Sequence, residues 1–250
     1  MNELDQFQHF HSIPSTNLYA VELLSKSNPK PFTVISADFQ SAGMGQIGSK
    51  WVSEPGQNVL MSIIVYPDFI NVSESFKLQF LASMACVEVL TPLVPHHDLS
   101  VKWPNDILVD HRKIAGVLIR NIFLGNAIRN SVIGIGLNVN QTQFPNSLTD
   151  ATSLKSITGK EFSVPEIRQK LFQKFQALYR LLEQGKSLKE VYLMMLYGYG
   201  EEFAYFDLTD QSYKQGEIVD VQGSGHLLVR VSDGVERYDF KEIQFLMDEK

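Results

Sequence analysis

Cysteine is almost absent from this sequence, since Cys86 is the one thiol among 250 residues. A single cysteine excludes an internal disulfide framework and fits a reducing compartment. Basic residues are also scarce: 22 lysines and arginines stand against 28 acidic residues, which gives a net charge of −6. Proteins that bind nucleic acid through its phosphates need a basic surface. From this composition we expect no DNA binding.

Long hydrophobic runs are missing as well. The longest, such as residues 59–65, fall far short of the roughly 18 apolar residues that a membrane-spanning helix needs. Residues 1–10 are polar and include two acids, which argues against a signal peptide. The remaining composition is ordinary for a globular protein, 44% hydrophobic and 20% charged, and this length can bury one large core or one large and one small core. We expect a soluble cytoplasmic protein with no membrane segment.

Up to about residue 202, the hydrophobic pattern predicts helices and strands that are connected mainly by hairpins. Helical patterns cover residues 18–25, 73–90 (amphipathic, with Cys86 in the core), 165–184 and 188–197. Strand patterns cover residues 33–37, 58–66, 107–109, 113–120 and 132–139. Because hairpins predominate over strand–helix–strand units, we expect an α+β domain over residues 1–202 with a mixed or largely antiparallel sheet.

The composition changes after residue 202. Short alternating strands are predicted at 217–221, 226–231, 236–240 and 243–246, with turn residues at 223–225 and 233–234 between them. Several short strands separated by tight turns are typical of a small barrel. We therefore expect a second, barrel-like β domain over residues 203–250.

Residues 101–116 hold the most informative set of chemically useful side chains. The proline in Lys-Trp-Pro-Asn-Asp at 102–106 fixes a bend before Asn105 and Asp106, and a hairpin should return Lys113 to their side. Asp106 would then bind Mg²⁺, Asn105 would contact a nucleotide, and Lys113 would neutralise charge on a transferring phosphoryl or acyl group. The alternative is that Asp106 is only a turn acid and Asn105 only forms an Asx-turn.

A glycine-rich loop spans residues 40–57. Its Gly-x-Gly-x-x-Gly at 43–48 matches the dinucleotide-binding pattern by letter, but no apolar helix follows, and Ser49-Lys50 is not the end of a Walker loop. We interpret it as a mobile flap whose backbone N–H groups and Lys50 close over phosphates. A plain flexible loop is the alternative, and Trp51 is then either hinge packing or a stacking wall for a base.

A second candidate site lies at the start of the first predicted helix. Ser15, Thr16 and Asn17 either cap this helix or bind the polar head of a ligand, and Gln40 is similarly placed just before the flap. Gly116 would let a flat ligand approach the strand backbone.

Five segments together resemble biotin protein ligases. They are Ser-Thr-Asn at 15–17, Ala-Asp-Phe-Gln-Ser-Ala-Gly-Met-Gly at 37–45, Lys-Trp-Pro-Asn-Asp at 102–106, Lys-Ile-Ala-Gly at 113–116 and Gly-Ile-Gly-Leu-Asn at 134–138. Their order and spacing agree from about residue 12 to the end, and the most specific signal is the 102–106 run followed by Lys113. The resemblance implies the class II synthetase-like α+β fold with a small C-terminal SH3-like β-barrel.

The resemblance also implies a two-step reaction. Biotin and MgATP would form biotinyl-5′-adenylate and pyrophosphate, and biotin would then pass to one lysine of a biotin carboxyl carrier protein. A homodimer is compatible with this assignment. The implied catalytic residues are Lys113 and the Mg²⁺ ligand Asp106. The implied biotin-binding residues are Ser15, Thr16, Asn17, Gln40, Gly45, Gln46, Lys113 and Gly116. The implied ATP-binding residues are Met44, Lys50, Trp51, Asn105 and Asn138.

Two departures and two alternatives accompany this resemblance. Some family members carry an N-terminal helix-turn-helix and repress transcription, whereas the Ser-Thr-Asn motif begins here at residue 15, so we expect no repressor activity. The adenylate loop of the family is usually arginine-rich, whereas Met44, Gln46 and Ser49 stand at positions that are often Arg. The first alternative is a lipoate or octanoate ligase or transferase on the same fold. The second is a biotin-binding regulator without catalytic activity.

Overall fold

A computed structural model describes residues 6–46 and 48–246. Its larger sheet has seven strands in the order β1-β2-β3-β7-β6-β5-β4, and only the β1–β2 pair is parallel. The α+β class with a mixed sheet, as predicted, is confirmed. These strands are β1 (Phe7–Ile13), β2 (Thr33–Gln40), β3 (Asn58–Val65), β4 (Leu99–Lys102), β5 (Asp106–Val109), β6 (Arg112–Leu124) and β7 (Ala127–Asn138).

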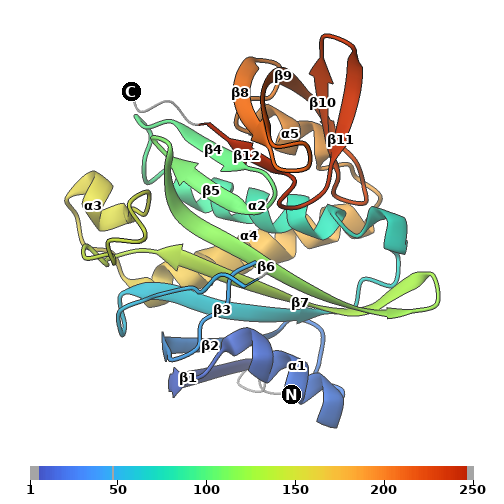
Figure 1. The fold of residues 1–250 in the computed structure, drawn as a ribbon. Coiled ribbons are helices and arrows are strands. Elements are labelled where there is room, and N and C mark those ends of the chain that lie inside the picture. The colour runs from blue at the N-terminus through green and yellow to red at the C-terminus, as the bar shows by residue number, and fades with distance from the viewer. Residues whose placement is uncertain (1–5, 47, 247–250) are drawn as a thin grey trace.

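Helices cover both faces of this sheet (Figure 1). Helix α1 (Thr16–Lys26) packs on one face, where Ala20 meets Ile35 and Ile64. Helices α2 (Lys77–Leu90) and α4 (Val164–Glu183) cover the other face and pack against each other. Successive strand residues point to opposite faces, so Val34 belongs to the larger core while its neighbour Ile35 lies beneath α1. Two short helices, α3 (Leu154–Thr158) and α5 (Lys189–Met194), complete the α-helices of the described residues.

Helix α2 differs from its prediction. The sequence predicts an amphipathic helix from residue 73, but a 3-10 turn, η2 (Val72–Glu74), comes first and α2 begins at Lys77. Every residue of α2 except Lys77 and Glu88 is buried, because α2 lies between the sheet, α4 and α5. Burial raises the pKa of the Cys86 thiol to about 12, which agrees with a core residue rather than a nucleophile.

Two hairpins shape the part of the sheet that carries the candidate residues. A two-residue turn at Asp110 and His111 joins β5 to β6, with φ of 48° and 62°, as a tight hairpin turn requires. Strands β6 and β7 then form a long hairpin that extends to Leu124 and Ala127. The sequence predicts only its inner half, because the outer half is partly polar and exposed.

The C-terminal part forms a five-stranded sheet in the order β11-β10-β9-β8-β12. Its strands are β8 (Glu202–Asp207), β9 (Ser212–Val221), β10 (Leu227–Val231), β11 (Gly234–Tyr238) and β12 (Ile243–Phe245). Strand β8 lies outside the predicted set. Within the described residues the edge strands β11 and β12 do not pair with each other, so the expected barrel is an open sheet.

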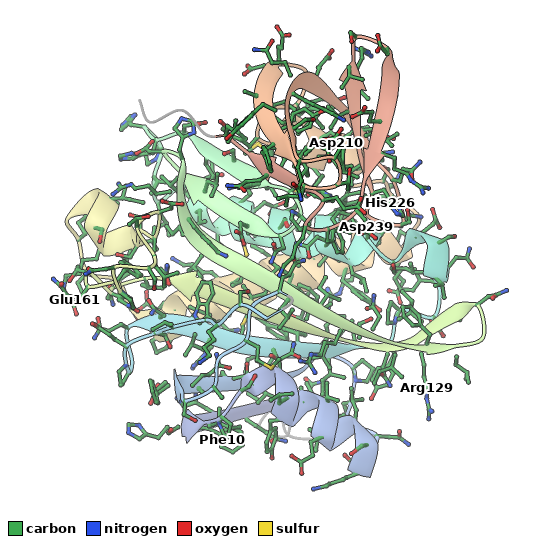
Figure 2. All side chains as sticks on the ribbon, viewed as in Figure 1. Phe10, Arg129, Glu161, Asp210, His226 and Asp239 are labelled. Atoms are coloured by element: carbon green, nitrogen blue, oxygen red, sulfur yellow. The ribbon has the colours of Figure 1, made fainter. Side chains whose placement is uncertain are left out.

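Hydrogen bonds and a shared core attach this small sheet to the rest of the protein. The Trp103 indole N–H donates to the Gly225 carbonyl over 2.9 Å, and Phe76 N–H donates to the Gly223 carbonyl over 2.9 Å. Phe76 and Phe240 also meet with their ring centroids 6.0 Å apart. Figure 2 shows Asp210 in this upper part and Phe10 on β1 at the opposite end.

Of the helices in the described residues, none is long and apolar enough to cross a membrane.

Candidate functional site

Three neighbouring pockets share one residue, Lys113. The polar pocket lies at the start of α1 and includes Ser15, Thr16, Asn17, Gln40, Ser62 and Gln46. The apolar pocket includes Val52, Asn138, Phe144, Leu148 and Ala151. The charged pocket includes Lys102, Asp106, His111, Thr149 and Asp150. The Lys113 ammonium therefore lies where the polar, apolar and charged pockets meet.

A hydrogen-bond network holds the polar pocket open at the N-terminus of α1. The Gln40 side-chain oxygen accepts from Thr16 N–H over 2.7 Å and lies 3.0 Å from the Thr16 hydroxyl. The Thr16 and Ser62 hydroxyls lie 2.9 Å apart. Ser15 caps the helix by accepting from Leu18 N–H over 3.4 Å. The sequence offered a helix cap and a ligand pocket as alternatives for this segment. The structure combines them, because Ser15 caps the helix and also lines the polar pocket.

Asn17 leaves one buried hydrogen-bonding atom without a partner. Asn17 is 4% exposed and its Nδ2 donates to the Leu118 carbonyl over 3.3 Å, whereas no donor among the described residues reaches its Oδ1. A Cβ at Gly134 would lie 2.9 Å from Asn17 Nδ2, so glycine at this position makes room for the amide. An unpaired buried oxygen costs about 1–3 kcal/mol. A ligand N–H in the polar pocket would remove that cost.

Trp51 lies over two glycines that face each other on neighbouring strands. Gly116 on β6 pairs with Gly136 on β7, and a Cβ at Gly136 would come within 2.5 Å of the indole ring. The Lys113 ammonium lies 5.8 Å from the centre of this ring. The Trp51 indole N–H is buried and has no acceptor in the part of the chain that the structure describes. Trp51 therefore separates the polar pocket from the apolar pocket, and a side chain on Gly136 would displace it.

The glycine-rich loop folds as a small hairpin over the polar pocket. Trp51 N–H donates to the Gly43 carbonyl over 3.1 Å, and Gly45 N–H donates to the Ser49 carbonyl over 2.9 Å. Gly45 and Gln46 line the polar pocket, and Met44 lines it too, although the resemblance implied an ATP contact there. Lys50 is exposed beside the apolar pocket. Ile47 lies outside the described residues.

Met44 has a cationic neighbour on the sheet. The Arg120 guanidinium on β6 reaches the Met44 sulfur over 3.4 Å. The loop itself is poor in arginine, so Arg120 supplies a guanidinium from a different element of the chain. Spacing within the loop gave no signal for this contact.

Asp106 and Lys113 meet across the β5–β6 hairpin. Their charged atoms, Asp106 Oδ1 and Lys113 Nζ, lie 2.6 Å apart, although the backbone of Asp106 pairs with Gly116 and that of Lys113 with Leu108. The contact lacks hydrogen-bond geometry, and no other described donor reaches this buried oxygen. One carboxylate is enough for Mg²⁺, which takes one or two carboxylates and completes its shell with water and substrate phosphate. Among the described residues no cluster of three or more acidic, His or Cys side chains could hold a metal alone.

The two candidate asparagines differ in what they leave free. Asn105 uses its Nδ2 to donate to the Val117 carbonyl over 2.8 Å, which fixes the turn after Pro104, and it lines the polar pocket. Asn138 lines the apolar pocket and donates to the Thr152 carbonyl over 2.9 Å, while its buried Oδ1 has no partner within residues 6–46 and 48–246. Asn138 therefore keeps an acceptor for a ligand in the apolar pocket.

Each candidate residue inferred from the sequence lines one of the three pockets. Sequence reasoning missed Ser62, Phe144 and Lys102. Ser62 has apolar residues on both sides within β3, and a lone hydroxyl at such a position could have indicated a role in the pocket. Lys102 belongs to the Lys-Trp-Pro-Asn-Asp run, but nothing in the spacing gave it a role. Phe144 lies in an irregular segment, where periodicity carries no information.

Sequence comparisons place the chain among ligases. The model of the Biotin/lipoate A/B protein ligase family matches residues 9–138. The bifunctional ligase/repressor BirA of Bacillus subtilis is 30% identical over 243 residues, which cover 94% of this chain and 73% of that protein. The biotin–[acetyl-CoA-carboxylase] ligase of Mycobacterium tuberculosis is 34% identical over 126 residues, 48% of this chain and 44% of that protein.

A solved structure supports the same relationship. The biotin protein ligase of Aquifex aeolicus, in complex with biotin and ATP, superposes with a TM-score of 0.76 at 25% identity. The match covers 96% of this chain and 97% of that one. The similarity therefore extends through both sheets and is not confined to the pockets.

Proposed function

We propose that this chain, which belongs to the biotin/lipoate A/B protein ligase family, is an ATP-dependent biotin protein ligase. It would join biotin to AMP and then transfer biotin to a lysine of a biotin carboxyl carrier protein. The observation that carries the proposal is the position of Lys113 at the junction of three pockets of different chemistry. Biotin has a polar ureido head and a carboxylate tail, and ATP has a flat base and a polyphosphate, so the two substrates need such a junction.

The first step forms a mixed anhydride. A carboxylate oxygen of biotin attacks the α-phosphorus of ATP, the bond to the bridging oxygen breaks, and pyrophosphate leaves with the electron pair. The ureido head would occupy the polar pocket, where the unpaired Asn17 Oδ1 accepts one ureido N–H. The Lys113 ammonium would then lie between the biotin carboxylate and the α-phosphate. A fixed cation at this position stabilises the charge that develops in the transition state.

The adenine base would occupy the apolar pocket. Phe144 and Leu148 supply apolar surface there, and the buried Asn138 Oδ1 offers an acceptor to the amino group of the base. Trp51 borders this pocket and the polar pocket, so its indole would close the adenylate off from water. Exclusion of water protects a reactive anhydride from hydrolysis.

Asp106 would hold Mg²⁺ through its carboxylate. When bound, the ion would neutralise polyphosphate charge. In the second step the amine of the carrier lysine attacks the anhydride carbonyl, an amide forms, and AMP leaves. Lys113 would again face the charge on the phosphate.

The absence of DNA binding remains a prediction from the net charge.

The lipoate ligase alternative fits the polar pocket less well. The dithiolane ring of lipoate has no N–H group, so the Asn17 oxygen would stay unpaired beneath it. A buried acceptor without a donor costs free energy, and a site built around one rejects a ligand that cannot pair with it. Asn17 thus favours biotin over lipoate.

Pyrophosphate exchange into ATP tests the proposal, with biotin, lipoate or octanoate as the acid. We expect exchange with biotin alone, and biotinylation of a carrier domain when one is added. Exchange with lipoate or octanoate but not with biotin would assign the chain to the other branch of the family. Tight binding of biotin with no exchange for any acid would support the regulator instead.

A further inference from the structure

The charged pocket contains Lys102, to which neither the sequence analysis nor the proposed function gives a role. Lys102 is the last residue of β4 and pairs with Asp106, the first residue of β5. The two residues flank the Trp103–Pro104 bend, and both line the charged pocket together with Lys113. The same turn that places the candidate Mg²⁺ ligand therefore places a second ammonium group beside it.

Lys102 differs from Lys113 in its partners. Lys113 has a carboxylate oxygen 2.6 Å away, whereas no described carboxylate lies within ion-pair distance of Lys102. Its ammonium lies 5.9 Å from the centre of the Phe245 ring. A partly buried cation without an ion pair is costly, so an anion in the pocket would stabilise it.

Asp150 lines the same charged pocket and has a hydrogen-bond partner of its own. Asp150 accepts a hydrogen bond from its neighbour, the Thr149 hydroxyl, over 2.9 Å. The glycine-rich loop offers only exposed Lys50 as a cation among its described residues. Loss of pyrophosphate concentrates negative charge on the departing group, and fixed cations are the usual means of stabilising it. The protein therefore needs a fixed cation on the leaving-group side of the α-phosphate.

We propose that Lys102 is a catalytic residue of the adenylation step, whose ammonium binds the departing pyrophosphate in the charged pocket. The inference rests on the proposed function. Lys113 contacts the attacking carboxylate side of the α-phosphate, and Lys102 contacts the β-phosphate as the bond to its bridging oxygen breaks. The second step releases AMP and no pyrophosphate, so Lys102 is not needed there.

The test compares Lys102→Met and Lys102→Arg with the matched control Lys170→Met, which removes an exposed lysine of α4. Three rates are measured with biotin: single-turnover adenylate formation, conversion of purified biotinyl-5′-adenylate and pyrophosphate into ATP, and transfer from the purified adenylate to a carrier domain. For Lys102→Met we expect adenylate formation to fall about 100-fold, as for loss of one preorganised contact to developing charge. The pyrophosphate concentration that half-saturates the reverse reaction should rise about tenfold, since a charge-assisted hydrogen bond is lost.

Transfer from the purified adenylate should change less than twofold, Lys102→Arg should recover part of the lost adenylation, and Lys170→Met should behave as wild type. A loss of all three activities together in Lys102→Met would show a structural role and overturn the inference. Unchanged adenylation and unchanged pyrophosphate saturation would also overturn it. If the wild-type protein forms no adenylate from biotin, the proposed function itself fails, and that result is seen before any variant is compared.

Discussion

The indole ring of Trp51 occupies the space that a side chain at Gly136 would need, because a Cβ there would lie 2.5 Å from Trp51 Cε2. Gly136→Ala should therefore force Trp51 off the sheet. We expect it to destabilise the protein by about 1–3 kcal/mol, as overpacking does, and to slow adenylation. Denaturant unfolding and pyrophosphate exchange measure the two effects.

Gly116→Ala is the matched control for this steric argument. A Cβ at Gly116 would lie 3.2 Å from the same ring, so its cost should be smaller. Trp51→Ala combined with Gly136→Ala should recover most of the stability lost by the glycine change, since contacting residues couple in a double-mutant cycle. Additive effects of the two changes would show that Trp51 is not what Gly136 accommodates.

Asn17→Ala tests recognition of the ureido head. Its unpaired Oδ1 is the acceptor assigned to biotin, so we expect the KM for biotin to rise about tenfold, the equivalent of one hydrogen bond at roughly 1.4 kcal/mol. The KM for ATP should stay unchanged, because Asn17 lies in the polar pocket and not in the apolar one. Steady-state exchange with each substrate varied in turn gives both constants. A rise in the KM for ATP alone would mean that ATP, and not biotin, occupies the polar pocket.

Lys113→Ala should reduce adenylation by about 100-fold or more, on the order of 3 kcal/mol, because it removes a preorganised charge at the transition state. The side chain is 37% exposed, so the fold should tolerate the loss. Single-turnover adenylate formation and thermal unfolding are the measurements. Near-normal adenylation in a folded Lys113→Ala protein would show that Lys113 does not stabilise the transition state.

The Asp106–Lys113 contact was predictable because local rules fix it. A proline bend before Asp106 and a tight hairpin between the two residues leave the chain few geometries. The helix cap at Ser15 is equally local. The packing of the Trp51 ring on Gly136 was not predictable. It depends on the position of a long loop relative to a sheet that is assembled from distant segments. The same holds for Arg120 beside Met44.

Errors at the level of elements also have physical causes. Helix α2 looks amphipathic by spacing, but two layers cover it, and only the tertiary arrangement shows the second one. Four of the C-terminal strands were predictable from alternation, whereas β8 and the open edges of this sheet at β11 and β12 were not. Closure of a sheet depends on strand tilt and register, which periodicity does not encode.

The arginine-poor loop leads to a comparison of Lys50 with Gln46. Lys50 is an exposed cation beside the apolar pocket, and Gln46 lines the polar pocket. We expect Lys50→Ala to weaken ATP use by about tenfold, since a charge-assisted hydrogen bond is worth roughly 1.5–3 kcal/mol, and Gln46→Ala to do less, at about 0.5–1.5 kcal/mol. The ATP dependence at saturating biotin decides between them. A larger effect of Gln46→Ala would mean that the loop works by amide recognition.

A buried carboxylate in the C-terminal sheet predicts how stability depends on pH. Burial alone would raise the pKa of Asp207, but hydrogen bonds from Lys214, Thr209 and Tyr238 hold it well below its usual value. Lys214 Nζ and the Tyr238 hydroxyl lie 2.8 and 2.9 Å from Asp207 Oδ2. Asp207→Asn removes the charge from this network and should cost about 2 kcal/mol at neutral pH, as loss of charge-assisted hydrogen bonds does.

The sign of the pH effect follows from linkage. An Asp with a folded pKa below its unfolded value of about 3.9 contributes stability above that value and loses it as pH falls towards the folded pKa. Wild type should therefore lose its advantage over Asp207→Asn between about pH 4 and the acid limit of folding. Asp210→Asn is the control: this carboxylate also contacts Lys214, but its side chain is 48% exposed, so the cost should be smaller. Urea unfolding at several pH values measures each difference, and a gap between wild type and Asp207→Asn that widens on acidification would contradict the account.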